Sequence, residues 1–279
     1  PIATYGLIRE KIAQMAVECF AAESVVWMVA HYIDAGFDDY SVEAAISKVY
    51  ASEAIQRAAY EALQIAAGAG FMRNLPYEQA VRDCRILSIF EGTNEVLRLY
   101  IALSGLKELG KSLAELRTAV DEIFNNPIKG FGVLTDYAER RLTHVTGVGR
   151  DKIVGKIPSA LREATSIYEK YTVELAKASD FLLRKYGKSI AGRQHALKRV
   201  ADMTIDLFVG LCVLSRATSL ATEAGDAGKR AVGIAHAFAR QAKRRMANNV
   251  RRIERNEDEE MELLAGFVLD SGSYPWDID

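Results

Sequence analysis

The feature that most limits the possible folds is a helical period that recurs through most of the chain. From residue 5 to 35, apolar side chains return at steps of three and four, as on one face of an α-helix. No stretch alternates with a period of two for long enough to form a strand. The chain has only five prolines, and they fall at expected helix starts or in breaks. The sequence therefore predicts an all-α fold.

Breaks in the pattern divide the chain into three parts. Residues 1–110 are predicted to form a helical-bundle domain, and residues 159–279 a second, helical-bundle extension. Residues 111–158 between them are rich in glycine and are predicted to be a connector, either packed or membrane-associating through Phe124, Ile128, Phe131 and Leu134. The expected helices cover residues 5–35, 41–68, 76–83, 96–109, 159–186, 189–224 and 226–254. Ser41 is expected to be an N-cap.

Composition narrows the possible functions. Lys and Arg total 36 and Asp and Glu total 37. The net charge is therefore close to zero, and no overall electrostatic field would attract nucleic acid or a membrane surface. No apolar run reaches the ~18 residues of a spanning helix. The three cysteines and four histidines show no metal-ligand spacing, and the cysteines are expected to be buried, reduced thiols. Because the chain begins at Pro1 within a helical pattern, we expect it to be a fragment of a longer protein.

The segment Arg240–Glu262 carries a dense basic run followed by an acidic one. One interpretation is an amphipathic helix that meets anionic lipid or a partner protein. The alternative is a solvated helical face whose charges are balanced locally. Nucleic-acid binding fits poorly, because the acidic block opposes it and no aromatic residues interleave.

Glu91 is the carboxylate that local pattern singles out. It follows the apolar pair Ile89 and Phe90 and precedes Gly92. A carboxylate among apolar neighbours is a stronger base than one in water, which suits a general base. Gly92 would let a substrate or cofactor approach the backbone closely. The alternative is a carboxylate at a helix start, with Thr93 or Asn94 as the cap.

Gly68 and Gly70 have two interpretations as well. Glycines at this position commonly cap a helix C-terminus. They can also let the backbone approach a phosphate, although their spacing is neither a Rossmann nor a P-loop fingerprint.

Two motifs together resemble the acyl-CoA dehydrogenase family. The first is the run QIAAGAGF at residues 64–71, and the second is IFEGTNE at residues 89–95, with Arg82-Asp83 between them. The resemblance covers the first ~110 residues as that family's C-terminal helical domain. The rest resembles the extension of the very-long-chain type and of the family member that assembles respiratory complex I, most clearly at residues 197–202 and 213–217.

The resemblance implies an FAD-dependent oxidoreductase in which Glu91 is the catalytic base. Glu91 and Gly92 would meet the acyl-CoA substrate, and Thr93 and Glu95 would contact the adenosine diphosphate part of FAD. Gln64, Gly68 and Gly70 match the family's loop that reaches the flavin of a neighbouring subunit, which implies at least a homodimer. No metal is implied. Ala67 and Glu95 depart from the family pattern, since glycine and glutamine are common there.

The function implied is α,β-dehydrogenation of long or very long acyl-CoA in fatty acid β-oxidation, with electron-transfer flavoprotein as the acceptor. The family's N-terminal helical and middle β-domains have no counterpart in this chain, so the fragment alone is expected to be inactive. The alternative function is a helical protein-interaction module like that of the complex I assembly relative. We expect a bacterial cytoplasmic protein ahead of one in the mitochondrial matrix or at the inner membrane.

Overall fold

The computed structural model describes residues 1–107, 157–222 and 225–276. Within these ranges every regular element is a helix, which confirms the all-α prediction. The helices are α1 (Gly6–Asp34), α2 (Ser41–Phe71), α3 (Tyr77–Arg85), a helical segment 94–107, α6 (Arg162–Tyr186), α7 (Gln194–Thr222), α8 (Asp226–Glu254) and α9 (Asp258–Ser271). Short 3-10 turns are η1 (Ile2–Thr4), η2 (Ile86–Ser88), η4 (Ser159–Leu161) and η5 (Gly187–Gly192).

Two local expectations need correction. Ser41 is the first residue of α2 rather than its N-cap, and its N–H donates to the Asp39 carboxylate at 3.0 Å. Helix α9 was not expected at all. Its first turn carries Asp258, Glu259 and Glu260, which suit the positive end of a helix dipole, whereas in the sequence they extend a charge run. The connector predicted at 111–158 lies largely outside the described residues.

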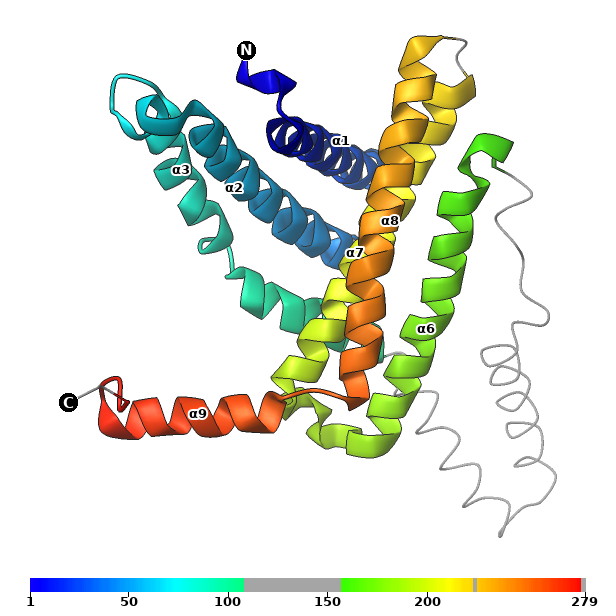
Figure 1. The fold of residues 1–279 in the computed structure, drawn as a ribbon. Helices are drawn as coiled ribbons and strands as arrows, with labels where there is room; N and C mark the ends of the chain where they lie inside the picture. Colours follow the sequence, from blue (N-terminus) through cyan, green and yellow to red (C-terminus); the bar gives the residue numbers. More distant parts are fainter. Residues whose placement is uncertain (108–156, 223–224, 277–279) are drawn as a thin grey trace, which may run out of the picture.

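Helix α7 is the centre of the molecule. It packs against α8, α1, α6 and α2, so that α1–α3 lie on one side of the α7–α8 pair and α6 on the other (Figure 1). Helix α9 leaves the foot of α8 and points away from the other helices (Figure 1). Helices from both predicted domains therefore pack against one another around α7. The domain boundaries themselves stay a prediction.

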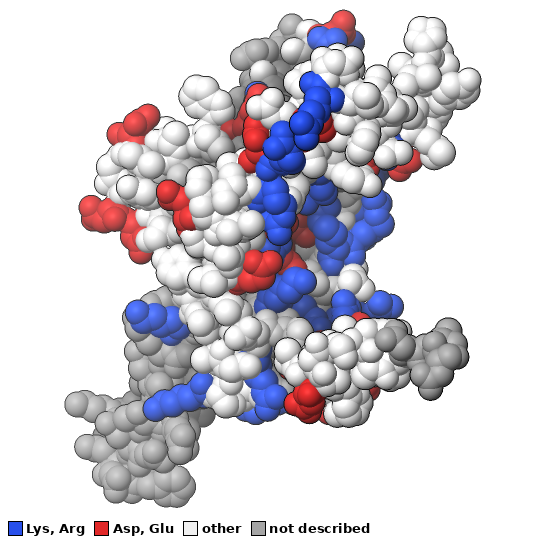
Figure 2. All heavy atoms as spheres, turned by 90° about the vertical axis from the view of Figure 1, so that its left-hand side faces the viewer, with Lys and Arg blue, Asp and Glu red and all other residues white. Residues whose placement is uncertain are grey.

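Charged side chains of α8 pair with neighbouring helices. Arg245 donates to Asp206 on α7 at 2.6 to 3.1 Å, and Arg240 donates to Glu163 on α6 at 2.9 and 3.0 Å. Arg252 pairs with Glu257 just beyond the end of α8. On the face nearest α1–α3, Lys and Arg form a stripe with acidic side chains beside it (Figure 2). These pairs agree with local charge balance, and contact with anionic lipid or a partner protein stays a prediction.

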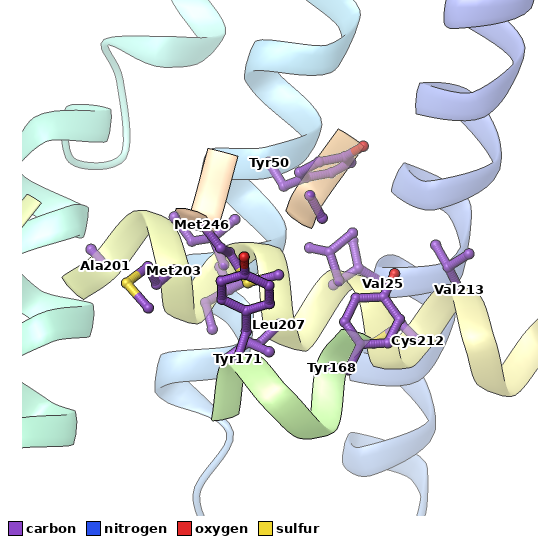
Figure 3. Close-up of a cluster of buried hydrophobic side chains, with 14 of the residues drawn as sticks. Val25, Tyr50, Tyr168, Tyr171, Ala201, Met203, Leu207, Cys212, Val213 and Met246 are labelled. Carbon is purple, nitrogen blue, oxygen red and sulfur yellow. The ribbon is translucent and has the colours of Figure 1, made fainter. Parts of the chain in front are cut away.

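One buried cluster joins the two predicted domains. Figure 3 shows side chains of α1, α2, α6, α7 and α8 meeting in it, among them Val25, Tyr50, Tyr168 and Met246. Gly210 on α7 permits this packing, because a Cβ there would lie 2.3 Å from Cε1 of Tyr168. Burying such apolar surface is the main stabilising contribution available to a helical fold.

Helix α1 corrects the expectation that no segment is apolar enough to span a membrane. An 18-residue window of α1 has a mean hydropathy of 1.4 with no more than two charged residues, although it is not an unbroken apolar run. By length and composition alone it could span a membrane, but core helices pass the same test. Within α1, Val17, Ala21, Val25 and Val29 are buried, and α1 packs against α2 and α7.

The cysteines differ from expectation as well. Cys19 is exposed, Cys84 is partly exposed and only Cys212 is buried. Burial raises the pKa of the Cys212 thiol to about 12.

Candidate functional site

A sharp turn at residues 89–93, here called the Glu91 turn, joins η2 to the helical segment 94–107. Glu91 has φ +59° and Gly92 has φ +88°. A positive φ is costly for a residue with a side chain, so the surrounding structure must hold Glu91 in place. Thr93 Oγ1 accepts the N–H of Val96 at 3.3 Å. Thr93, rather than Asn94, therefore caps the helix that follows.

Lys48 and Asn94 tie the Glu91 turn to α2. Lys48 Nζ donates to the Gly92 carbonyl and to Asn94 Oδ1, each at 2.8 Å. The Asn94 amide is only 3% exposed and donates to Ser52 Oγ at 3.0 Å. Burial lowers the pKa of Lys48, although the charges of nearby carboxylates, Glu91 among them, partly oppose this.

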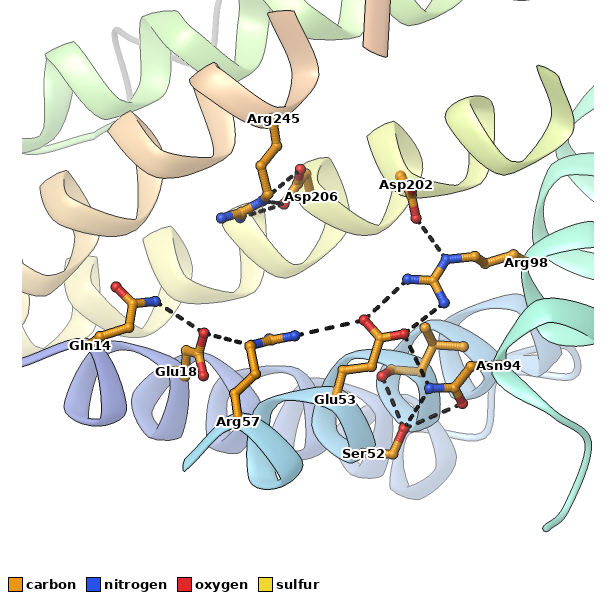
Figure 4. Close-up of polar contacts among 11 residues, drawn as sticks. Gln14, Glu18, Ser52, Glu53, Arg57, Asn94, Arg98, Asp202, Asp206 and Arg245 are labelled. Carbon is orange, nitrogen blue, oxygen red and sulfur yellow. Dashed lines mark hydrogen bonds and ion pairs between the residues drawn. The ribbon is translucent and has the colours of Figure 1, made fainter. Parts of the chain in front are cut away.

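Arg98 connects this region to the extension. Its guanidinium donates to both carboxylate oxygens of Glu53 on α2, at 2.7 and 3.1 Å, and to Asp202 on α7 at 2.7 Å (Figure 4). Burial alone would raise the pKa of Glu53, but the hydrogen bonds and charge of Arg98 outweigh it and hold that pKa below its usual range. Lys48 and Arg98 were not predicted from the sequence, and Asn94 was expected only as a possible helix cap. The local signal was that Asn94 and Arg98 are four residues apart on one helical face.

Glu91 itself is exposed, as are Ile89 and Phe90. The apolar surroundings expected from its sequence neighbours are therefore not formed by the described residues. Gly92 is exposed as well, and the nearest side chain to a Cβ placed on it would be Leu97, at 3.4 Å.

The second motif lies at the other end of α2. The predicted helix stop at Gly68 is a break at Ala67, which has φ +53° and ψ −139°, and the helix then continues to Phe71. A Cβ on Gly68 would meet nothing within 4 Å, whereas one on Gly70 would lie 2.6 Å from the Leu63 carbonyl oxygen. Gly68 thus leaves the backbone open to close approach, and Gly70 is required by packing.

Ala67→Gly is expected to stabilise the protein by about 1 kcal/mol. The backbone conformation of Ala67 costs roughly 1–3 kcal/mol for a residue with a side chain, which exceeds the ~0.4–1 kcal/mol that glycine costs through unfolded-state entropy. The melting temperature of the full-length protein measures this. Ala69→Gly is the control, because Ala69 is helical and its replacement should destabilise by ~0.5–1 kcal/mol. A lower melting temperature for both variants would contradict the strain argument.

The structure brings together only part of the predicted site. Glu91, Gly92 and Thr93 lie in the Glu91 turn, next to Lys48, and Glu95 lies in the first turn of the helical segment that follows. Gln64 lies sixteen positions after Lys48 on α2, which at ~1.5 Å per residue is about 24 Å along the helix axis. Gln64, Gly68 and Gly70 therefore form a separate group.

Two hollows adjoin the Glu91 turn, and Glu95 lines both. One, of about 430 Å³, is lined by Glu53, Gln56, Arg57, Arg85, Ser88, Asn94 and Glu95. The other, of about 1220 Å³, extends past Arg98 to the α6–α7 turn and the start of α9. Both are polar and carry charges of each sign. Within the described part of the chain, no group of three or more His, Cys, Asp or Glu lies close enough together to hold a metal ion.

Two family models match the chain. Residues 1–106 match the model described as acyl-CoA dehydrogenase, C-terminal domain. Residues 159–274 match the model described as ACAD9/ACADV, C-terminal domain.

Similar proteins agree with these matches. The mitochondrial very long-chain specific acyl-CoA dehydrogenase of Rattus norvegicus is 34% identical over 95% of this chain and 40% of its own length. Its Homo sapiens counterpart is 37% identical over 80% of this chain and 33% of its own. The probable acyl-CoA dehydrogenase FadE10 of Mycobacterium tuberculosis is 28% identical over 99% of this chain and 44% of its own. The chain thus spans about 40% of the length of its first curated relatives.

A solved structure shows the same fold. The acyl-CoA dehydrogenase from Bacillus anthracis, complexed with FAD, superposes with a TM-score of 0.73 over 99% of this chain and 47% of that one, at 22% sequence identity.

Proposed function

Residues 1–106 belong to the acyl-CoA dehydrogenase family through its C-terminal domain, and residues 159–274 to the ACAD9/ACADV C-terminal domain family; from this premise we propose that the chain is the C-terminal part of an FAD-dependent dehydrogenase of long and very long acyl-CoA. The observation that carries the proposal is the Glu91 turn. The Glu91 side chain is exposed and its backbone has a positive φ, a costly conformation of the kind that clusters at active sites. Lys48 ties the turn to α2 through the Gly92 carbonyl.

In the proposed reaction Glu91 is the base. Its carboxylate removes the α-proton of the acyl-CoA thioester, while the β-hydrogen leaves as hydride. The backbone N–H of Glu91 would donate to the thioester carbonyl and stabilise the enolate-like charge that develops there. Bound FAD would supply the hydride acceptor. Gly92 is exposed and has no side chain, so the acyl chain can pass close to the turn.

The described residues fit a flavin in part. Thr93 Oγ1 accepts from Val96, and its hydroxyl hydrogen is still able to donate to an FAD oxygen. Glu95 is exposed, but its charge would repel a pyrophosphate, so we assign it a place beside the adenosine diphosphate part rather than a direct phosphate contact. Gly68 leaves its backbone open to approach, while Gly70 lets the last turn of α2 pack against the Leu63 carbonyl.

A second copy of the chain would complete the site. Gln64 and Gly68 lie at the far end of α2 from the Glu91 turn, and we propose that they meet a flavin held by a partner subunit. We propose a homodimer on this ground. Electron-transfer flavoprotein is the proposed acceptor. Relatives include mitochondrial and mycobacterial proteins, and we place this protein in a bacterial cytoplasm ahead of a mitochondrial matrix or inner membrane.

The direct test is anaerobic mixing of the FAD-loaded full-length protein with palmitoyl-CoA. The flavin absorbance should bleach at a rate on the order of 10 s⁻¹, typical of enzymes. Butanoyl-CoA is the control and should bleach it much more slowly. A protein that holds FAD and is bleached by neither thioester would contradict the proposed function.

A further inference from the structure

Helix α7 of the extension reaches the Glu91 turn through one arginine. We propose that Asp202 on α7 is a positioning residue for Glu91, acting through Arg98 and Glu53 on the polar contacts that hold the turn. The proposal rests on the proposed function for its catalytic consequence, but its structural part stands on contacts alone.

The first step is the orientation of Arg98. Asp202 Oδ1 accepts from Arg98 Nε at 2.7 Å, across 104 positions of sequence. The other guanidinium nitrogens donate to the two oxygens of Glu53. A guanidinium is planar, with its donors in a fixed fork, so a carboxylate at Nε fixes the plane in which the other nitrogens meet Glu53. Only 15% of the Arg98 side chain is exposed, which leaves few alternative rotamers.

The second step carries this constraint to the turn. Glu53 Oε1 also accepts from Asn94 Nδ2 at 3.2 Å, so one oxygen serves both Arg98 and Asn94. Asn94 Oδ1 in turn shares Lys48 Nζ with the Gly92 carbonyl. The path from α7 therefore ends on the carbonyl of Gly92, the residue directly after Glu91 (Figure 4 shows its course from Asp202 to Asn94).

The third step is the strain at Glu91. A non-glycine residue keeps a positive φ only where its surroundings over-determine it. Buried polar networks couple strongly, because each unpaired member is costly. Arg57 also lies near Glu53, but at 3.8 Å, and it hydrogen-bonds Glu18 instead. Arg98, held by Asp202, is therefore the main restraint on Glu53.

The test compares three variants of the FAD-loaded full-length protein. Asp202→Ala removes the acceptor, and Asp202→Asn keeps an oxygen for Nε. Asp258→Ala is the matched control: Asp258 pairs with Arg199 of α7 rather than with Arg98, and its side chain is 23% exposed against 26% for Asp202. Hydrogen exchange of peptides covering residues 91–97 and the rate of flavin bleaching by palmitoyl-CoA are measured for each.

We expect Asp202→Ala to speed exchange at residues 91–97 and to lower the maximal bleaching rate about 10-fold, since small misplacements of reacting groups are costly. The palmitoyl-CoA concentration at half-maximal rate should change less than ~2-fold, because binding contacts are kept. Asp202→Asn should recover most of the rate. Asp258→Ala should match wild type in both measurements, even if its melting temperature falls equally.

Unchanged exchange in Asp202→Ala would overturn the proposal, as would equal changes in Asp202→Ala and Asp258→Ala. Faster exchange with an unchanged bleaching rate would overturn the catalytic role of the coupling. If the wild-type flavin is not bleached at all, the proposed function fails, whereas the exchange result still decides whether Asp202 holds the turn.

Discussion

Glu91→Gln should slow flavin reduction by palmitoyl-CoA about 1,000-fold in the full-length protein, within the range that a positioned general base contributes. Glutamine has nearly the shape of glutamate but cannot accept the α-proton. The side chain of Glu91 is exposed, and no hydrogen bond ties it to the described residues, so the fold should be kept. Stopped-flow absorbance of the flavin measures the rate, and circular dichroism verifies the helical content.

Glu163→Gln is the matched control for this prediction. Glu163 is also an exposed helical-region carboxylate, but it pairs with Arg240 on the far side of α7 from the turn. The flavin of the Glu163→Gln variant should be bleached by palmitoyl-CoA at the wild-type rate. Retained bleaching in Glu91→Gln would remove Glu91 as the base. Absence of bleaching in the wild type, with FAD bound, would instead favour the protein-interaction module as the function of these helices.

The helices were predictable because local spacing determines them. Residues 226–254 were predicted as one helix, and α8 spans Asp226–Glu254, since glycine and polar breaks flank a continuous amphipathic stretch. Helix α9 was missed because its acidic first turn looks like the end of the preceding charge run. The sharing of one core by α1, α2, α7 and α8 was not predictable, since it depends on which apolar faces meet.

The candidate site shows the same division. The motif around Glu91 and the cap at Thr93 lie within a few residues, so the sequence contains them. Arg98 meets Asp202 across 104 positions, and no local period records such a contact. The described residues do not form the apolar surroundings expected for Glu91, because apolar neighbours in sequence do not cover a side chain unless other segments pack over it.

Phe238→Ala should destabilise the protein by about 3–5 kcal/mol, the usual cost of truncating a buried phenylalanine. Phe238 on α8 is 2% exposed, and its ring meets that of Tyr50 on α2 edge to face, with centroids 6.1 Å apart. The Arg245 guanidinium lies 5.6 Å from the Phe238 centroid. Truncation would therefore open a cavity where the extension meets the first bundle and would also remove two specific ring contacts.

Phe267→Ala on α9 provides the matched control, because it is the same substitution at a side chain that is 48% exposed. It should change stability by less than ~0.5 kcal/mol, as surface substitutions usually do. Thermal unfolding of both full-length variants, followed by circular dichroism, tests the difference. If the extension were only loosely attached to the first bundle, Phe238→Ala would melt within a degree or two of Phe267→Ala. A large difference between the two melting temperatures would mean that one core stabilises both parts. The helices that carry Arg98 and Asp202 would then be held rigidly against each other.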